Sequence, residues 1–392
     1  LLDKSPNDID LTTDATDEEI LSLFPEAILA GQVFGVYKIP FKRHQTQDTV
    51  IVDLTVFRKE DEYIDGRRPL KVERSTPEED ARRRDFTMNS LFYDLKNRCV
   101  IDYCLGISDI NDRILKCVGD PEKRFKEDHL RLLRLIRFSF QLGFKIEDST
   151  YQAAYKLANL ISTVSGERIQ DELNKLVKSL VLSFKESEYL LFWQNDLTKE
   201  IFKSLGFEYR VSQSHLESRF KISFDTYKEY QISYKDFFVQ SLWLVFEEDF
   251  EKTEKFLIQM KFSKKEIIYL NKIKQIKEKL NNLNNKEYSL AVQLSKVSEL
   301  NEKVQSLYIY SYFAEVGYFS ETLIVKALNL ISEIPEPLLQ GSELAQLGYR
   351  AEIKDILDLI RELQFCRKLQ SKDQALDYVN STFKDIKSTQ KQ

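Results

Sequence analysis

The segment Thr49-Val50-Ile51-Val52-Asp53-Leu54-Thr55-Val56-Phe57 decides how the first part of the chain folds. It is dense in β-branched residues, which are enriched in strands, so it predicts a β-strand. Because side chains alternate along a strand, every second residue from Val50 to Val56 shares one face and Asp53 projects from the other. One apolar and one polar face indicate a sheet with a buried side and an open side. Cys99 to Tyr103 is a plausible second strand.

Beyond about Gly119 the pattern becomes helical. Asp120-Pro121 is typical of a helix start, and apolar residues recur at helical spacing between Leu132 and Phe140. Gly143 favours a helix end. Ser165-Gly166-Glu167-Arg168 predicts the start of another helix. The chain therefore begins as mixed α/β and continues as helices.

Composition sets the broad class of the protein. With 392 residues the chain predicts several domains, and a charged fraction of 31% with only 11 Gly and 8 Pro favours a helix-rich protein. No apolar run reaches the roughly 18 residues of a membrane span. The four cysteines form no Cys-x-x-Cys pair, which favours reduced thiols in the cytoplasm. Net charge is -5, so only local patches, such as Glu251 to Leu280 with nine Lys and four Glu, suit nucleic acid.

Two aspartates near the start suggest a metal site. Asp8 and Asp10 share one face if Asp8-Ile9-Asp10 lies in a strand, while Ile9 and Leu11 face the core. Two carboxylates on one face can hold two divalent cations about 3.5–4 Å apart, as phosphoryl transfer requires. Hard oxygen ligands favour Mg²⁺. Asp53, on the polar face of a neighbouring strand, is a candidate third ligand.

A second cluster suggests base recognition. Glu127 to Leu142 predicts one helix in which Asp128 and Arg131 are neighbours, Arg134 lies one step further round, and Arg137 points away from Asp128. A carboxylate accepts from the exocyclic amino group of cytosine or adenine, and a guanidinium donates to the adjacent ring nitrogen. Uracil and guanine would reverse both hydrogen bonds, so the pair predicts selection of C and A. For Arg137 a phosphate contact or a structural ion pair is expected.

Five ordered motifs resemble those of class II tRNA nucleotidyltransferases, the CCA-adding enzymes, and their relatives the bacterial poly(A) polymerases. They are similar to the metal, ribose-binding, hinge, nucleotide-selecting and last neck motifs of that family. In chain order they are Asp8–Thr16, Arg83–Asn89, Asp102–Asp112, Arg124–Arg134 and Ser165–Ile169. A weaker match, Pro337–Leu344, resembles the family's tail, where Ser342 is expected to cap a small helix.

The resemblance implies an α+β chain. A polymerase-β-like nucleotidyltransferase head with a mixed sheet, residues 1–117, is followed by an all-α neck (118–180), an RNA-binding body (181–335) and a tail (336–392). It implies Asp8 and Asp10 as catalytic metal ligands and Mg²⁺ as the cofactor. It implies a nucleotide site made of Arg84, Asp85, Asn89, Asp128, Arg131, Arg134 and Arg137. The implied substrates are tRNA, CTP and ATP.

Two further features bear on the activity. The family carries a Gly-Gly-x-Val-Arg-Asp segment just before the metal motif, whereas this chain starts at Leu1-Leu2, so an N-terminally truncated head is expected. Lys59 to Pro69 looks like the full-length flexible loop of relatives that add A, which argues against a CC-only enzyme. Addition of C, C and A is the favoured expectation. A-only addition, poly(A) synthesis and a non-catalytic RNA-binding relative stay open.

Overall fold

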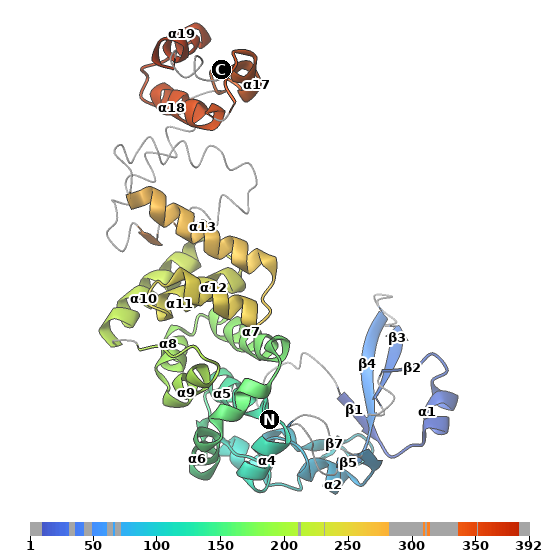
Figure 1. Cartoon of the computed structure of the whole chain (residues 1–392). Helices are drawn as coiled ribbons and strands as arrows, with labels where there is room; N and C mark the ends of the chain where they lie inside the picture. Colours follow the sequence, from blue (N-terminus) through green and yellow to red (C-terminus); the bar gives the residue numbers. More distant parts are fainter. Residues whose placement is uncertain are drawn as a thin grey trace. The chain divides into compact units, whose positions relative to one another are not determined.

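The computed structural model describes residues 10–30, 36–42, 49–60, 66, 72–210, 213–230, 232–281, 309, 312–313, 336–350 and 352–383. Asp8 and most of Lys59 to Pro69 lie outside these residues. The chain divides into two compact units, residues 1–210 with 258–262, and residues 211–257 with 263–392. Each unit is described by itself; Figure 1 labels their elements. The division into head, neck, body and tail remains a prediction.

The first unit begins with a four-stranded mixed sheet, as expected. Its strands are β1 (Asp10–Thr13), β2 (Ile28–Leu29), β3 (Val36–Lys42) and β4 (Thr49–Val56), in the order β1-β4-β3-β2. β1 runs parallel to β4, while β4–β3 and β3–β2 are antiparallel. The strand predicted from Thr49 is thus confirmed as a central strand.

One face of this sheet is buried and the other is open. Tyr37, Ile39, Leu54 and Val56 pack with Ile20 of α1 (Asp17–Leu23) in a common core. The alternation predicted for the central strand is confirmed at its C-terminal end, where Leu54 and Val56 are buried, while Val50 and Val52 on the same face are half-buried. The opposite face carries the polar side chains.

Short elements connect the sheet to the helices. Two hairpins come first, β5 (Arg58–Glu60) with β6 (Val72–Arg74), and β7 (Phe92–Asp94) with β8 (Cys99–Ile101). The second strand predicted near Cys99 is confirmed. α2 (Pro77–Arg82) and α3 (Gly106–Asn111) follow their hairpins, and β9 (Ile114–Leu115) pairs with β10 (Lys145–Ile146).

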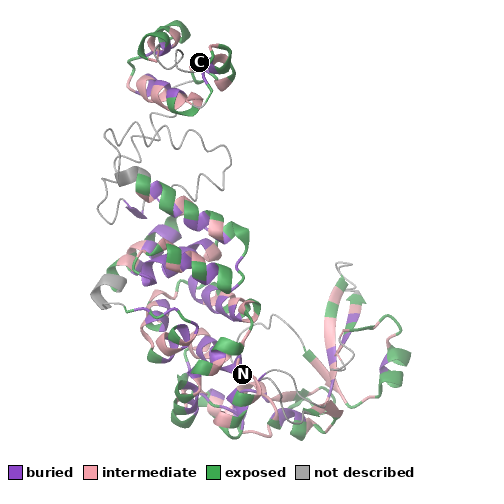
Figure 2. Cartoon of the chain, in the orientation of Figure 1, coloured by how far each residue is buried: buried purple, intermediate pink, exposed green. Residues whose placement is uncertain are grey.

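A helical region completes the first unit. It comprises α4 (Pro121–Glu127), α5 (Arg131–Leu142), α6 (Asp148–Lys156), α7 (Gly166–Leu182), α8 (Glu186–Gln194) and α9 (Asp196–Ser204). Asp120 caps α4 as predicted, and Gly143 ends α5 with φ +69°. α5 and α7 pack through fully buried leucines, and Figure 2 shows their buried stripes in purple.

The second unit is helical throughout the residues that the structure describes. It contains α10 (Gln213–Tyr230), α11 (Tyr234–Val245), most of α12 (Phe250–Gln259), α13 (Lys264–Asn281), α17 (Gly341–Gln346), α18 (Ile353–Phe365) and α19 (Lys372–Thr382). α11 is buried on all sides from Asp236 to Val245, so it is the central helix around which others pack. α17, α18 and α19 share a small core of their own.

Ser342 does not cap the tail helix, so that prediction is wrong by two residues. The N-cap is Gln340, whose backbone N–H donates to the Glu343 carboxylate at 2.8 Å. Glu343 therefore satisfies the helix start from the third helical position, and Ser342 lies inside the helix. In the described part of the chain, no helix has both the length and the apolar character that crossing a bilayer requires.

Candidate functional site

The open face of the head sheet carries a row of charged residues across three strands. Asp10 of β1 is in register with Asp53 of β4, which is in register with Lys38 of β3. The Lys38 ammonium lies 3.0 Å from an Asp53 carboxylate oxygen. Because residues in register on neighbouring strands lie side by side, the two carboxylates are placed as the predicted third-ligand role of Asp53 requires.

This row is the part of the predicted metal site that the structure describes. Asp8, predicted to complete it, lies outside the described residues. Among the residues that are described, no group of three or more His, Cys, Asp or Glu side chains is arranged to hold a metal. The carboxylate oxygens of Asp10 and Asp53 are ligands of the type that Mg²⁺ prefers.

A cavity of about 680 Å³ joins this face to the predicted ribose-binding segment. Asp10 and Arg84 both line it, together with Thr12, Phe57 and the β7–β8 hairpin from Phe92. A cavity of this size is in the range of small-molecule sites. Asp128, Arg131, Arg134 and Arg137 are not among its described lining residues. The structure thus brings Asp10 and Arg84 together at one cavity, whose described lining does not include the other predicted nucleotide-site residues, Asp85, Asn89, Asp128, Arg131, Arg134 and Arg137.

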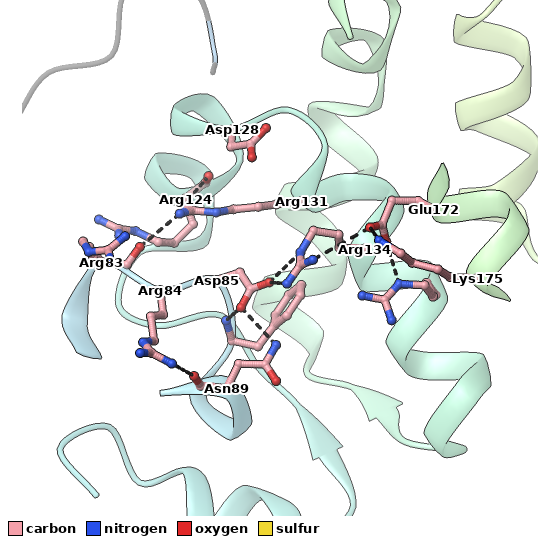
Figure 3. A network of polar contacts seen from close by, with 12 residues as sticks. Arg83, Arg84, Asp85, Asn89, Arg124, Asp128, Arg131, Arg134, Glu172 and Lys175 are labelled. Carbon is pink, nitrogen blue, oxygen red and sulfur yellow. Dashed lines mark hydrogen bonds and ion pairs between the residues drawn. The ribbon is translucent and has the colours of Figure 1, made fainter. Parts of the chain in front are cut away.

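Arg84 is fixed on two sides. Its Nη1 donates to the backbone carbonyl of Asn89 at 2.9 Å, as Figure 3 shows. Its guanidinium carbon lies 4.6 Å from the centre of the Phe92 ring, a cation–π contact. Asn89, predicted to bind nucleotide, also donates from Nδ2 to Asp85 at 3.1 Å. Its described contacts therefore hold Arg84 and Asp85 of the same motif.

Asp85 points into the protein and anchors the segment predicted to bind ribose, Arg83–Asn89, to α5. It is 7% exposed and accepts from Arg134 Nε at 2.7 Å, from Asn89, and from the backbone N–H of Phe86. Burial alone would raise the pKa of Asp85, but the charge of Arg134 and these hydrogen bonds outweigh it and hold the pKa below its usual value. Burial likewise opposes the charge of Arg134, yet Asp85 and Glu172 raise the pKa of its guanidinium.

The single helix predicted from Glu127 to Leu142 is wrong. α4 ends at Glu127, and Asp128 is extended at φ −139° and ψ 107°. The backbone N–H of His129 donates to the carbonyl of Gly66, and that of Leu130 donates to the Asp128 carboxylate. These two partners replace the carbonyls that a continuous helix would use, so the helix stops and α5 starts afresh.

The break changes which guanidinium meets Asp128. Its carboxylate lies 2.9 Å from Nη2 of Arg168 in α7, and both side chains are 23% exposed. Arg131 instead donates to Glu127 at 2.8 Å and to the backbone carbonyls of Arg124 and Arg83. Only 10% of the Arg131 side chain is exposed. Each of the two side chains predicted to read a base together thus has another ion-pair partner, Arg168 for Asp128 and Glu127 for Arg131.

Arg124 and Arg131 secure the end of α2. Arg124 donates to the carbonyl of Arg82 at 3.2 Å, and Arg131 donates to that of Arg83 at 3.0 Å. Carbonyls at a helix C-terminus lack partners within the helix, and cations satisfy them well. The Glu127 carboxylate forms ion pairs with both guanidiniums, at 2.7 Å from Arg124 and 2.8 Å from Arg131. Figure 3 shows Arg124 and Arg131 side by side. The i,i+3 and i,i+4 spacing of Arg124, Glu127 and Arg131 could have revealed these pairs in the sequence.

Arg137 makes the structural ion pair that was one of its two expected roles. Its Nε lies 2.5 Å from the carboxylate of Glu172, which is 2% exposed, and its guanidinium also stacks on Phe138. Lys175 lies 3.4 Å from the same carboxylate, and Arg134 lies 3.8 Å from it. Figure 3 shows Arg134 between Asp85 and Glu172, so one network links the segment after α2 to α5 and α7.

Comparison with known proteins agrees with this architecture. Residues 1–116 match the family model for the poly A polymerase head domain, and residues 143–205 match that for a probable RNA and SrmB-binding site of polymerase A. The CCA-adding enzyme of Staphylococcus epidermidis (strain ATCC 12228 / FDA PCI 1200) is 40% identical over 178 residues. That match covers 45% of this chain and 43% of the relative, so it spans less than half of each.

Solved structures share the fold over nearly the whole chain. The Bacillus stearothermophilus CCA-adding enzyme in complex with CTP matches with a TM-score of 0.66 and 21% identity, over 98% of this chain and 91% of that one. The Thermotoga maritima CCA-adding enzyme complexed with tRNA_CCA matches with a TM-score of 0.65 and 17% identity, over 96% and 87%. The two matched segments, residues 1–116 and 143–205, are thus similar to the head domain and the probable RNA-binding region of poly A polymerases.

Proposed function

We propose that this protein adds C, C and A in turn to the 3′ end of tRNA. The 3′-hydroxyl of the RNA attacks the α-phosphate of CTP or ATP, and pyrophosphate leaves. The observation that carries the proposal is that Asp10 and Arg84, from two separate motifs, line one cavity of about 680 Å³. This supports a site in which an acidic group holds a metal and a guanidinium binds the nucleotide. The similarity to a named CCA-adding enzyme favours C, C and A over the A-only and poly(A) alternatives.

The residues of the open face fit a hard divalent cation. We infer that Asp8, Asp10 and Asp53 hold Mg²⁺, which when bound lowers the pKa of the attacking hydroxyl and neutralises the triphosphate. Lys38, 3.0 Å from Asp53, would compete with the cation for that carboxylate. The Arg84 guanidinium orients the nucleotide in the cavity beside Asp10.

Nucleotide selection is assigned to Asp128 and Arg131. The Asp128 carboxylate accepts from the exocyclic amino group of cytosine or adenine, and Arg131 donates to the adjacent ring nitrogen. For this, Asp128 must share its oxygens with Arg168, and Arg131 must release part of its contact with Glu127. Asn89, Arg134 and Arg137 support the site through their contacts with Asp85 and Glu172. The four free cysteines agree with a place in the reducing cytoplasm.

A nucleotide-incorporation assay tests the proposal. tRNAs that end before the CC step, after one C and after both are offered CTP, ATP, UTP or GTP with Mg²⁺. We expect CTP to be taken twice and ATP once, in that order, with neither UTP nor GTP used. Protein that takes ATP but never CTP would be an A-adding enzyme, and long tails on unstructured RNA would identify a poly(A) polymerase.

Substitution of the metal ligand separates catalysis from RNA binding. Asp10→Ala should abolish incorporation and leave tRNA affinity unchanged, because the metal acts on the reacting groups rather than on the RNA body. Asp148→Ala is the matched control, since its carboxylate is 93% exposed on α6, and it should keep full activity. Incorporation that survives Asp10→Ala would refute the metal role. Tight tRNA binding by wild type that incorporates no nucleotide would indicate a non-catalytic RNA-binding relative.

A further inference from the structure

Asp80, in α2, is a buried carboxylate that no sequence motif pointed to. It is 1% exposed. Its Oδ1 accepts from Arg83 Nε at 3.0 Å and Nη2 at 2.7 Å, and from the backbone N–H of Arg58 at 3.3 Å. Its Oδ2 accepts from Arg84 Nε at 3.2 Å. A charge this deeply buried is tolerated only when it is paired and hydrogen-bonded, and here two guanidiniums and a backbone amide meet that need.

The two guanidiniums differ in their further contacts. Arg83 turns back, and its Nε also donates to the carbonyl of Arg58 at 3.0 Å, which ties α2 to the start of β5. Arg84 lines the cavity that Asp10 also lines. Asp80 therefore holds the Nε edge of the Arg84 guanidinium, while the Asn89 carbonyl binds Nη1 and the Phe92 ring lies against the group.

This arrangement leaves donors on Arg84 for a ligand. A guanidinium has five N–H groups in a rigid fork. The described hydrogen bonds of Arg84 use Nε for Asp80 and one N–H of Nη1 for Asn89. Nη2 lies 3.2 Å from the same Asp80 oxygen, and the side chain is 29% exposed. The remaining N–H groups lie on the two terminal nitrogens, in a side chain whose direction is already set.

The charge of Arg84 supports the same role, because its guanidinium lines the cavity in which a polyanionic ligand would meet it. An oriented charge binds phosphate more tightly than a mobile one, because less side-chain freedom is lost on binding.

We propose that Asp80 is a positioning residue for Arg84, and that it fixes the guanidinium to receive the phosphate or ribose oxygens of a nucleoside triphosphate. This inference rests on the proposed function of the cavity. Asp80 acts through Arg84, so its effect on nucleotide binding should disappear once Arg84 is gone. A purely structural carboxylate would give an effect that is independent of Arg84.

The test compares Asp80→Asn, Arg84→Gln and the double variant with wild type. The matched control is Glu78→Gln, since Glu78 lies in the same helix and pairs with Arg82 at 2.7 Å but is 51% exposed. CTP affinity is measured by calorimetry with Mg²⁺, KM and kcat come from the incorporation assay, and circular dichroism checks the fold. Asp80→Asn should raise the Kd and KM for CTP about tenfold and change kcat less than about twofold. Glu78→Gln should match wild type.

The double variant decides the mechanism. In the Arg84→Gln background, Asp80→Asn should change the CTP Kd less than about twofold, because the two residues act as one unit. A tenfold loss that persists in this background, or an unchanged Kd in the single variant, would overturn the proposal. Should Asp80→Asn lose its circular dichroism signal, Asp80→Glu replaces it in the same comparison, because it keeps the charge but displaces the carboxylate.

The two proposals fail in different ways. Wild type that binds CTP yet incorporates none would overturn the proposed function, while the Kd comparison would still decide the role of Asp80. Wild type that binds neither CTP nor ATP would overturn both.

Discussion

Asp85→Asn is the change that should reveal most about how the ribose-binding segment is held. The substitution keeps the shape of the side chain and removes its charge. Asp85 is 7% exposed and lies 2.6 Å from a guanidinium nitrogen of Arg134. In the variant, the nearest carboxylate to Arg134 in the described network is Glu172, at 3.8 Å. The variant therefore leaves a largely buried guanidinium without its main counter-charge.

The expected loss of stability follows from this burial. Removing one partner of a buried ion pair costs about 3–5 kcal/mol, because the other charge stays desolvated. The Arg134 side chain is 30% exposed and keeps contact with the Phe138 ring, so water and the ring offset part of this cost. We expect a destabilisation of about 2–3 kcal/mol relative to wild type. For a unit of this size that corresponds to a fall in Tm of about 5–10 °C.

The assay follows the first unit alone. The chain has two tryptophans, Trp193 in the first unit and Trp243 in the second. In a Trp243→Phe background, fluorescence during urea unfolding reports on Trp193, which is fully buried. Asp85→Asn should lower the free energy of unfolding by the stated amount. The control Glu78→Gln breaks an exposed pair and should change it by less than about 0.5 kcal/mol. A loss below 0.5 kcal/mol for Asp85→Asn would refute the reasoning.

The pH dependence of stability provides a second test of the Asp85–Arg134 interaction. The folded-state pKa of Asp85 is depressed, because Arg134 and the hydrogen bonds outweigh the effect of burial. A depressed carboxyl pKa contributes stability that is fully present above the unfolded pKa of about 3.9 and is lost as pH falls through the folded pKa. The stability difference between wild type and Asp85→Asn should therefore be constant from about pH 5 to 7 and shrink below about pH 4. A difference that grows in acid would contradict this assignment.

Two further outcomes follow from local geometry. Gly66 has φ +66°, and an added Cβ would lie 2.1 Å from the His129 ring, so Gly66→Ala should destabilise the first unit by about 1–3 kcal/mol in the same urea assay; an unchanged midpoint would show that the ring simply moves. Burial, reinforced by the nearby Asp85 charge, raises the pKa of the Cys117 thiol to about 12, whereas Cys99 is exposed. Iodoacetamide at pH 8 should therefore modify Cys99 and spare Cys117 in the folded protein, as peptide mass spectrometry can check; equal labelling would contradict the buried placement.

Local features of the fold could be predicted from the sequence. The strand from Thr49, the cap at Asp120 and the helix end at Gly143 each depend on side chains that act within a few residues of themselves. The order of five motifs likewise predicted the similarity to poly A polymerases that residues 1–116 and 143–205 show. Such features can be predicted without knowing which residues pack against them in the folded protein.

The partners within the candidate site were decided by the tertiary structure. Asp128 meets Arg168, and Asp85 meets Arg134, across 40 and 49 residues of sequence. The helix expected through Asp128 breaks because Gly66, far away in the chain, accepts the N–H of His129. Helical periodicity cannot predict this break, since it shows which residues share a helix face and not which distant backbone groups will form hydrogen bonds with them. Buried charges choose partners by desolvation and geometry, and both exist only once the chain has folded.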